Sequence, residues 1–444
     1  MISLKTIGIF LSLPVKLLWV VIKYPFVGGI NNKFKNDLIN SLKLTIFRSA
    51  LGFPTEDKGK LSITTNEYLI NSIIAKQYPN LTKLLNNYGK NYDDNSIWIV
   101  EAENRSKQDP ILIYLHGGCF VFESAPSQIE GLLTFYNLID EEYRKKLSIL
   151  FLDYKLASKG YNVPYQLNQL IETYTKLVNE GNNNFITLGD SAGGTLTLTL
   201  LQKLKHDETL KSDSAGGTLI LTLLQKLKHD ETLKSFPFPK SSIMLSPWCK
   251  LVPDNEDYYL PNHSMHDNST FDMMQIHHYQ QMFSIQGMKQ MFGNNDFKSL
   301  TISPGNCNYS ISDWEKIPTF NDPGYSTLVI LGEDETMRDD ILQWCKYALG
   351  STLTPQRESS NGVWISDIHE YIRDDKQLSY VDVVVEPFGI HDGFFMFESG
   401  LLGDINKGKP VNVNELDKIK YFGTVKIVEF LNKVLSNSET KKTV

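Results

Sequence analysis

Seven short apolar segments separated by helical patterns constrain the fold of this chain most. Most of them are continuously apolar, as expected for parallel strands that are buried on both faces. They are SIWIV (96–100), ILIYLHG (111–117), LSILFLDYKL (147–156), NFITLGD (184–190), SSIMLSPW (241–248), STLVILGE (326–333) and VDVVVEPF (381–388). Helical patterns lie between or after them, at 165–180, 338–349 and 415–435. This alternation predicts an α/β fold with a mostly parallel central sheet flanked by helices.

The N-terminus carries a long apolar segment, IGIFLSLPVKLLWVVIKYPFVGGI at residues 7–30. Its length suits a helix that crosses a bilayer, and its aliphatic residues can offset the cost of burying two lysines. Lys5, Lys16 and Lys23 share one face of an ideal helix, which also suits a helix lying in the membrane interface. Pro14 predicts a kink or a restart of the helix. We expect a membrane anchor rather than a cleaved signal peptide, because no small-residue cleavage site follows.

Charge and cysteine content narrow the possible partners. The net charge of −7 argues against a nucleic-acid partner, since a phosphate-binding surface needs clustered lysine and arginine. The four cysteines form no C-x-x-C pair. They fit neither a zinc site nor a dense disulfide framework, so no metal is expected.

The orientation of the expected anchor is open. Basic residues follow the apolar segment, and the positive-inside rule would then keep the body of the protein cytosolic. These residues are Lys33, Lys35, Lys43 and Arg48. Glycosylation sequons do not decide the matter, because their number is close to that expected by chance for so much asparagine. They begin at Asn80, Asn104, Asn262, Asn268 and Asn308.

A candidate nucleophile follows the segment 184–190. Gly189-Asp190-Ser191-Ala192-Gly193 is a G-x-S-x-G sequence between a predicted strand and a predicted helix. Its glycines allow the sharp turn that leaves a serine oxygen exposed at the edge of the sheet. The simpler interpretation is a serine in a glycine-rich turn, so partners for Ser191 are needed.

The same sequence is duplicated. Residues 190–212 recur as residues 213–235, and the copies differ only at Thr197 and Ile220. Ser214 in the second copy is preceded by polar residues, and Ser212 stands where the first glycine of the turn belongs. We therefore expect Ser191 to be the nucleophile, one copy to belong to the fold, and the other to be looped outward on the surface.

A serine nucleophile needs donors for the oxyanion. The sequence YLHGGCF at 114–120 follows a predicted strand and offers the N–H groups of Gly117 and Gly118. The N–H of Ala192, the residue after the candidate nucleophile, is the expected further donor. His116 is expected to order this loop rather than to transfer protons.

HGG followed about seventy residues later by GDSAGG resembles the hormone-sensitive-lipase family of α/β-hydrolases. DYKLAS at 153–158 and LSPW at 245–248 resemble further segments of that family. The resemblance covers about residues 95–435 and implies an α/β-hydrolase fold, ester hydrolysis and no cofactor. It departs from the family at Cys119, which stands where a third glycine is usual.

The resemblance also implies the other two members of a catalytic triad. His391, followed by Gly393 and Phe394, resembles the family's H-G-F loop with Asp392 inserted, and would be the general base. The acid would come from GEDETMRDD, where alignment on the family's R-D places Glu335 at the carboxylate. Asp334 is the alternative, and the remaining acids would be helix-start or surface charges.

Within that family the chain is similar to the fungal steryl acetyl hydrolases, in its N-terminal anchor, its HGGCF, its acid-loop glutamate and its length. That similarity implies removal of acetyl groups from sterols by a single-pass endoplasmic-reticulum membrane protein with a lumenal catalytic domain. We expect an anchor at 1–30, a helical region at 31–95 and a catalytic domain at 96–444. Residues 249–325 are expected to form a cap-like insertion over the active site.

Three other functional interpretations stay open. The chain could be a general carboxylesterase, a triacylglycerol lipase, or an inactive relative that binds lipid. For a steryl acetate, a small acyl pocket would lie near Cys119 and Phe120, and apolar insertion residues would line a wide alcohol pocket. These are Met265, Phe271, Met273, Met274 and Met282. Equally, they could fill only the core of the insertion.

Overall fold

A single twisted sheet organises the computed structural model, which describes residues 2–61, 64–212, 236–398 and 400–440. Within these residues the strand order is β1-β2-β4-β3-β5-β6-β7-β9-β8. The strands are β1 (Asn91–Asp93), β2 (Ser96–Val100), β3 (Ile111–Leu115), β4 (Ser148–Leu152), β5 (Phe185–Asp190), β6 (Ser241–Leu245), β7 (Ser326–Gly332), β8 (Glu370–Arg373) and β9 (Tyr380–Glu386). Strands β3 to β7 and β9 run parallel to their neighbours among themselves. The predicted mostly parallel sheet is confirmed.

The edges of the sheet differ from the sequence prediction. β2 is buried throughout, as its apolar sequence requires, but it pairs antiparallel with β4. β1 and β8 were not expected, because both are short and incompletely buried. β3 and β4 end earlier than the segments 111–117 and 147–156, because the residues that follow them leave the sheet to form loops.

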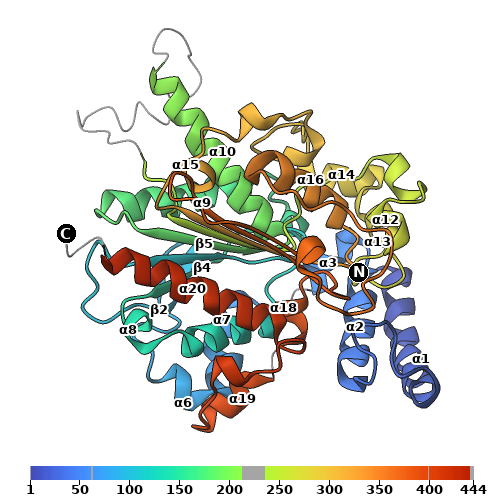
Figure 1. Ribbon diagram of the computed structural model, residues 1–444. Helices are drawn as coiled ribbons and strands as arrows, with labels where there is room; N and C mark the ends of the chain where they lie inside the picture. Colours follow the sequence, from blue (N-terminus) through green and yellow to red (C-terminus); the bar gives the residue numbers. More distant parts are fainter. Residues whose placement is uncertain (1, 62–63, 213–235, 399, 441–444) are drawn as a thin grey trace.

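Helices cover both faces of the sheet (Figure 1). α7 (Pro126–Leu138), α18 (Gly393–Phe397) and α20 (Phe422–Thr440) lie on one face, and α9 (Tyr165–Asn179), α10 (Ala192–Ser212) and α16 (Arg338–Leu349) lie on the other. α9 and α16 match the predicted helices. The helix predicted at 415–435 begins later, because the side chain of Asp417 accepts from the N–H groups of Ile419 and Lys420 and forms a turn there.

The N-terminal region is mainly helical. Its helices are α1 (Leu4–Val27), α2 (Leu38–Leu51), α3 (Thr55–Leu61), α4 (Asn66–Tyr68), α5 (Ala75–Gln77) and α6 (Pro79–Thr82), with the π-helix η1 (Leu69–Ile74). α1 continues through Pro14 and does not restart there, contrary to one expectation. Its most apolar 18-residue window has a mean hydropathy of 1.8, enough to cross a membrane, although a signal sequence shares these features.

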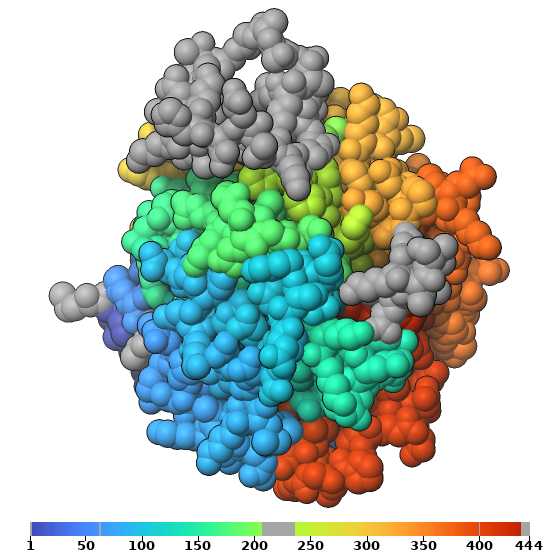
Figure 2. All heavy atoms as spheres, turned by 90° about the vertical axis from the view of Figure 1, so that its left-hand side faces the viewer, coloured from blue at the N-terminus to red at the C-terminus, as the bar shows by residue number. Residues whose placement is uncertain are grey.

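Distant parts of the chain meet below the sheet. In the space-filling view, the segment around residue 80 lies against the segment around residue 400 (Figure 2). The amide of Asn80 in α6 donates to the carbonyl of Asn406 at 3.2 Å, which joins α6 to α19 (Leu401–Asn406). Contacts of this kind tie the N-terminal helices to the C-terminal part of the fold.

The residues 249–325, called the insertion below, connect β6 to β7 through short helices. They are α12 (Ser264–Asp267), α13 (Ile276–Met282), α14 (Ile285–Phe292) and α15 (Pro318–Asn321), with 3-10 turns at Asn255–Tyr258, Pro304–Asn306 and Ile311–Asp313. α12 and α13 gather with α1, α2 and α3 on the right-hand side of Figure 1. The guanidinium of Arg48 in α2 donates to the carbonyls of Thr270, Phe271 and Asp272, so α2 packs directly on the insertion.

The structure describes only the first of the two copies of the duplicated sequence. The first copy, 190–212, begins with the last residue of β5 and continues as α10. This copy therefore belongs to the fold. The second copy, with Ser214, lies outside the described residues.

Candidate active site

Ser191 occupies a sharp turn between β5 and α10. Its φ of 50° is left-handed, a conformation that a serine adopts only where the surroundings impose it. A side chain at Gly189 would collide with the carbonyl of Gly193, and one at Gly193 would collide with the carbonyl of Leu115. The two glycines therefore permit the turn, and the turn points the serine oxygen away from the sheet.

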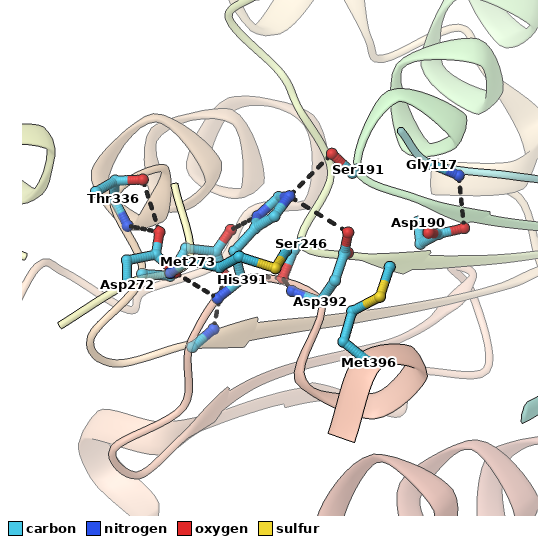
Figure 3. A network of polar contacts seen from close by, with 12 residues as sticks. Gly117, Asp190, Ser191, Ser246, Asp272, Met273, Thr336, His391, Asp392 and Met396 are labelled. Atoms are coloured by element: carbon cyan, nitrogen blue, oxygen red, sulfur yellow. Dashed lines mark hydrogen bonds and ion pairs between the residues drawn. The ribbon is translucent and has the colours of Figure 1, made fainter. Parts of the chain in front are cut away.

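His391 links Ser191 to a carboxylate. Its Nε2 lies 2.9 Å from Ser191 Oγ, and its Nδ1 lies 3.0 Å from Glu335 Oε1 (Figure 3). The three residues follow β5, β7 and β9, whose carboxyl ends meet at one edge of the sheet. Ser191 is 1% exposed, His391 2% and Glu335 0%, so the site is closed to solvent. The structure thus brings together the three residues predicted as a triad.

Two further donors hold Glu335 in place. Its Oε2 accepts from the N–H of Gly332 at 2.9 Å and from Ser246 Oγ at 2.9 Å. Asp334, the alternative acid, makes none of the described contacts with His391, and its own N–H donates to the carbonyl of Gly389. Burial, with the nearby Glu333, raises the pKa of Asp334 to about 7. The geometry therefore favours Glu335 as the partner of the imidazole.

A second carboxylate faces the same imidazole. Asp392 Oδ2 lies 3.4 Å from His391 Nε2, on the side that also faces Ser191 (Figure 3). Asp392 has a φ of 53°, which Asp tolerates better than most residues. Its Oδ1 is buried and has no partner within the described part of the chain. Burial raises the pKa of Asp392 well above its usual value.

The charges around His391 oppose the effect of its burial. Burial alone would lower the pKa of the imidazole. Asp392, the hydrogen bond that His391 donates to Glu335, and the more distant Asp272 stabilise the imidazolium and together raise this pKa. A histidine acts as a base only in its neutral form. The acidic side chains around His391 therefore affect the pH dependence of catalysis.

The oxyanion loop corrects one expectation. The N–H of Gly117 donates to Asp190 Oδ1 at 3.0 Å and so is not free to bind an oxyanion. Asp190 also accepts from Tyr114 Oη at 2.7 Å and Gln128 Nε2 at 2.6 Å, which fixes the loop to the turn that carries Ser191. Gly118 and Ala192 donate no N–H hydrogen bond within the residues described. Gly117 therefore holds the loop, and the N–H groups of Gly118 and Ala192 remain the candidate donors.

Cys119 occupies a position that suits glycine. Its φ is 57°, in the left-handed region that glycine adopts most readily. Its side chain is 3% exposed, and burial raises the pKa of the thiol to about 12. The group is therefore an uncharged thiol at neutral pH, and what this residue can offer an oxyanion is its backbone N–H.

His116 is enclosed by the loop that it begins. Its ring stacks on Tyr154 with centroids 4.0 Å apart, and its Nδ1 lies 2.7 Å from the carbonyl of Gly117. Tyr154 Oη donates to the carbonyl of His116 at 2.7 Å. Burial lowers the pKa of His116 to about 4, so the ring is neutral at physiological pH. These contacts suit a residue that orders the loop.

Asp272 of the insertion is a site residue that the sequence analysis missed. Its Oδ1 accepts from the N–H of His391 at 2.8 Å and from that of Met273 at 2.7 Å. Its Oδ2 accepts from Thr336 N at 2.8 Å and Thr336 Oγ1 at 2.7 Å (Figure 3). The carboxylate of Asp272 thus connects the loop that carries His391 to Thr336, the residue after Glu335. A lone aspartate in an irregular segment carries no motif, so no sequence signal identified it.

Metal-binding groups are not gathered at the site. No cluster of three or more His, Cys, Asp or Glu side chains placed to hold a metal occurs among the residues that the structure describes. All four cysteines are free thiols, and three of them are buried.

The strand order, the turn at Ser191 and the carboxyl-end position of the site define an α/β-hydrolase. The chain belongs to the steryl acetyl hydrolase family, whose sequence model matches residues 28–211 and 208–367. The two matches meet at the end of the first copy of the duplication. The predicted resemblance to steryl acetyl hydrolases is confirmed, and membership of this family supports carboxylic-ester hydrolysis.

Similar proteins come from fungi and bacteria. The mug81 protein of Schizosaccharomyces pombe, whose name proposes a steryl acetyl hydrolase, is 28% identical over 438 residues, covering 94% of this chain and 97% of that protein. Steryl acetyl hydrolase 1 of Saccharomyces cerevisiae is 25% identical over 174 residues, 38% of each chain. A crystal structure of an esterase from the bacterial hormone-sensitive lipase family is 17% identical, with a TM-score of 0.47, covering 88% of this chain and 98% of that one.

Proposed function

We propose that this protein is a serine ester hydrolase that removes acetyl groups from sterols or similarly bulky lipophilic alcohols. The observation that carries the serine mechanism is the continuous path from Ser191 Oγ through His391 to Glu335, with contacts of 2.9 and 3.0 Å. A serine that lay in a glycine-rich turn by chance would not face an imidazole whose other nitrogen is held by a carboxylate.

The reaction has two stages. Ser191 Oγ attacks the ester carbonyl carbon while His391 Nε2 takes its proton, and the imidazolium then gives that proton to the departing sterol oxygen. Water attacks the acetyl-enzyme in the same way, and acetate leaves. Glu335 keeps the imidazole oriented and stabilises its positive charge in each stage.

The oxyanion of each tetrahedral intermediate is held by backbone N–H groups. We assign this role to Gly118, Cys119 and Ala192. Ala192 follows Ser191 directly in sequence, and Gly118 and Cys119 lie on the loop after β3. Asp190 fixes that loop through Gly117. The donors are therefore held in position before the substrate arrives.

The preference for a bulky alcohol rests on the family and on the apolar N-terminal helix. Family membership and the apolar α1 both favour a lipophilic ester. Met265, Met274 and Met282 are each at most 1% exposed, so they pack within the protein and do not line an open pocket. A large alcohol must displace this packing, which flexible methionine side chains allow more readily than branched ones do.

A substrate series tests the proposal. The full chain should hydrolyse acetyl esters faster than esters of eight or more carbons on the same alcohol, and cholesteryl acetate faster than ethyl acetate. An optimum at long acyl chains would indicate a triacylglycerol lipase. Equal rates with the two acetates would indicate a general carboxylesterase. No hydrolysis and no labelling by a fluorophosphonate would indicate an inactive, lipid-binding relative.

Attachment to the endoplasmic-reticulum membrane with a lumenal catalytic domain is a separate proposal, and it rests on the resemblance to steryl acetyl hydrolases. It can be tested through glycosylation, because Asn104, Asn262 and Asn308 are exposed sequon asparagines. Asn268 is unsuitable, since its buried amide donates to the carbonyls of Glu333 and Glu335. Glycans on exposed sites would support a lumenal body, and an unmodified chain in microsomes would contradict it.

A further inference from the structure

A cavity of about 710 Å³ lies beside the end of β9, outside the candidate active site. Its walls are formed by four segments of the chain, residues 32–36, 361–370, 386–388 and 418–429. We call it the α20 cavity, because α20 supplies much of one wall. Ser191, Glu335 and His391 do not line it. Its volume lies in the range of sites that bind small molecules.

Three aromatic side chains line the α20 cavity, and we call them the aromatic wall. They are Trp364, Phe388 and Phe422. The ring of Trp364 lies 5.8 Å from that of Phe422 and 5.4 Å from that of His369, yet Trp364 remains 39% exposed. Its neighbours therefore fix the indole ring while part of it stays open to a ligand.

Phe388 reaches this wall through a strained backbone. Its φ is 55°, in the left-handed region that bulky residues rarely adopt. The N–H of Phe388 donates to Glu333 Oε2 at 2.8 Å, which holds the residue in this conformation. A side chain at Gly362 would lie 2.6 Å from the phenyl ring, so the glycine leaves room for it. Strain that the surroundings maintain in this way is typical of functional positions.

The charges of the cavity are almost balanced. Four lysines and three glutamates line it. The ion pairs are Lys33 with Glu386, Lys426 with Glu370 and Lys418 with Glu429. The fourth lysine, Lys35, is exposed and forms no ion pair with any residue that the structure describes. One positive charge at the cavity therefore lacks a partner within the protein.

We propose that the α20 cavity binds a lipophilic monoanion of the carboxylate class. The apolar body of such a molecule would lie on the aromatic wall, and its carboxylate would pair with Lys35. A neutral apolar ligand would leave this lysine without a partner, and a small anion would leave the aromatic wall uncovered. Binding of this ligand goes beyond the proposed ester hydrolysis and does not depend on it.

The carboxylate of Glu386, which lines the cavity, also supports the loop that carries His391. A side-chain carbon at Gly389 would lie 2.8 Å from Glu386 Oε2, and one at Gly393 would lie 3.1 Å from it. The carboxylate therefore packs against the backbone on both sides of His391. Its other oxygen pairs with Lys33 of the cavity wall. A ligand in the α20 cavity would thus lie one ion pair away from this loop.

Photochemical labelling tests the proposal and locates the site. The full chain is irradiated with 4-benzoylbenzoate, an aromatic monoanion that forms covalent adducts with nearby side chains, then digested and analysed by mass spectrometry. We expect adducts within residues 361–370 or 418–429. Laurate should compete with the probe, whereas acetate at the same concentration should not. Benzophenone, which has the same rings without the carboxylate, should label these segments at least about fivefold less.

Variants separate the two parts of the recognition. Lys35→Gln should reduce labelling about fivefold or more, and the matched control Lys298→Gln, at an exposed lysine of the insertion, should not. Trp364→Ala should reduce labelling, and Trp364→Phe should restore it. Thermal unfolding verifies that each variant folds. If Trp364→Ala unfolds, Lys35→Gln, at an exposed position, still tests the site.

Ser191→Ala distinguishes this site from the candidate active site. It should label as the unchanged chain does, because Ser191 does not line the cavity. Three results would overturn the proposal, whatever the activity of the enzyme. They are adducts confined to other segments, equal labelling of these segments by benzophenone, and loss of the adducts in Ser191→Ala.

Discussion

The N–H of His391 donates to Asp272 Oδ1 at 2.8 Å, although the two residues are 119 positions apart in the chain. The other oxygen of the same carboxylate accepts from the N–H and hydroxyl of Thr336, next to Glu335. The insertion therefore contributes a side chain that contacts both of these loops. It fixes the distance between the loops that carry the candidate base and the candidate acid.

Asp272→Asn should lower kcat up to about 100-fold with KM within about twofold, because an amide NH₂ would face donors and shift the His391 loop. Loss of the charge should also lower the pKa of His391 and move the acid limb of the pH profile to lower pH. The matched control is Asp267→Asn, an exposed insertion aspartate paired with His266, and should change neither quantity. If the variant is less stable but the acid limb of its pH profile does not move, the role of Asp272 is structural only.

Asp392→Asn should move the acid limb of kcat/KM to lower pH. The carboxylate 3.4 Å from His391 Nε2 stabilises the imidazolium and raises its pKa. Without that charge, the neutral base is present at lower pH. Asn also tolerates the left-handed conformation of this residue, so the backbone need not change. If the acid limb of kcat/KM does not move in this variant, Asp392 is already uncharged in the free enzyme.

Glu335→Gln should reduce kcat by about 10³-fold or more, since the imidazole loses the carboxylate that orients it and balances its charge. Asp334→Asn is the matched control, because Asp334 is adjacent in sequence but makes no described contact with His391. It should cost less than about tenfold. Single-turnover kinetics with a chromogenic acetate measures both variants. If Asp334→Asn proved the more damaging change, the acid would have been assigned to the wrong residue.

Cys119→Gly should leave kcat within about threefold of the unchanged enzyme, because only the backbone N–H of this residue is assigned to the oxyanion and glycine suits its φ of 57°. Inhibition by thiol reagents should be slow, since burial keeps the thiol protonated. Loss of activity in the glycine variant, with the fold intact by circular dichroism, would mean that the sulfur side chain itself shapes the acyl site.

The central sheet and the candidate triad were largely predictable from sequence, for a physical reason. Strands buried on both faces are continuously apolar, and residues that follow parallel strands gather at one edge of the sheet, so β5 predicts the place of Ser191. His391 was identified by its resemblance to the H-G-F loop of the family, at a position after β9. Glu335 needed the resemblance, because several acids follow β7 and only the register selects one of them.

Other features were not predictable from local pattern. β1 and β8 are too short and too exposed to show periodicity. Asp272 becomes significant only when the fold brings it to residues far away in sequence. The role expected of Gly117 was wrong because its N–H binds Asp190, the neighbour of Ser191, across two loops. Such long-range pairings are properties of the packed protein rather than of any segment.

Locating the activated serine tests the assignment of Ser191 as the nucleophile most directly. The full chain is treated with a fluorophosphonate, digested, and analysed by mass spectrometry, which distinguishes the peptide of Ser191 from that of Ser214 because only the first contains Gly189. We predict a single adduct on Ser191, and none in Ser191→Ala or after loss of the imidazole in His391→Ala. An adduct on Ser214, or on no serine while ester hydrolysis continues, would contradict the site described for this protein.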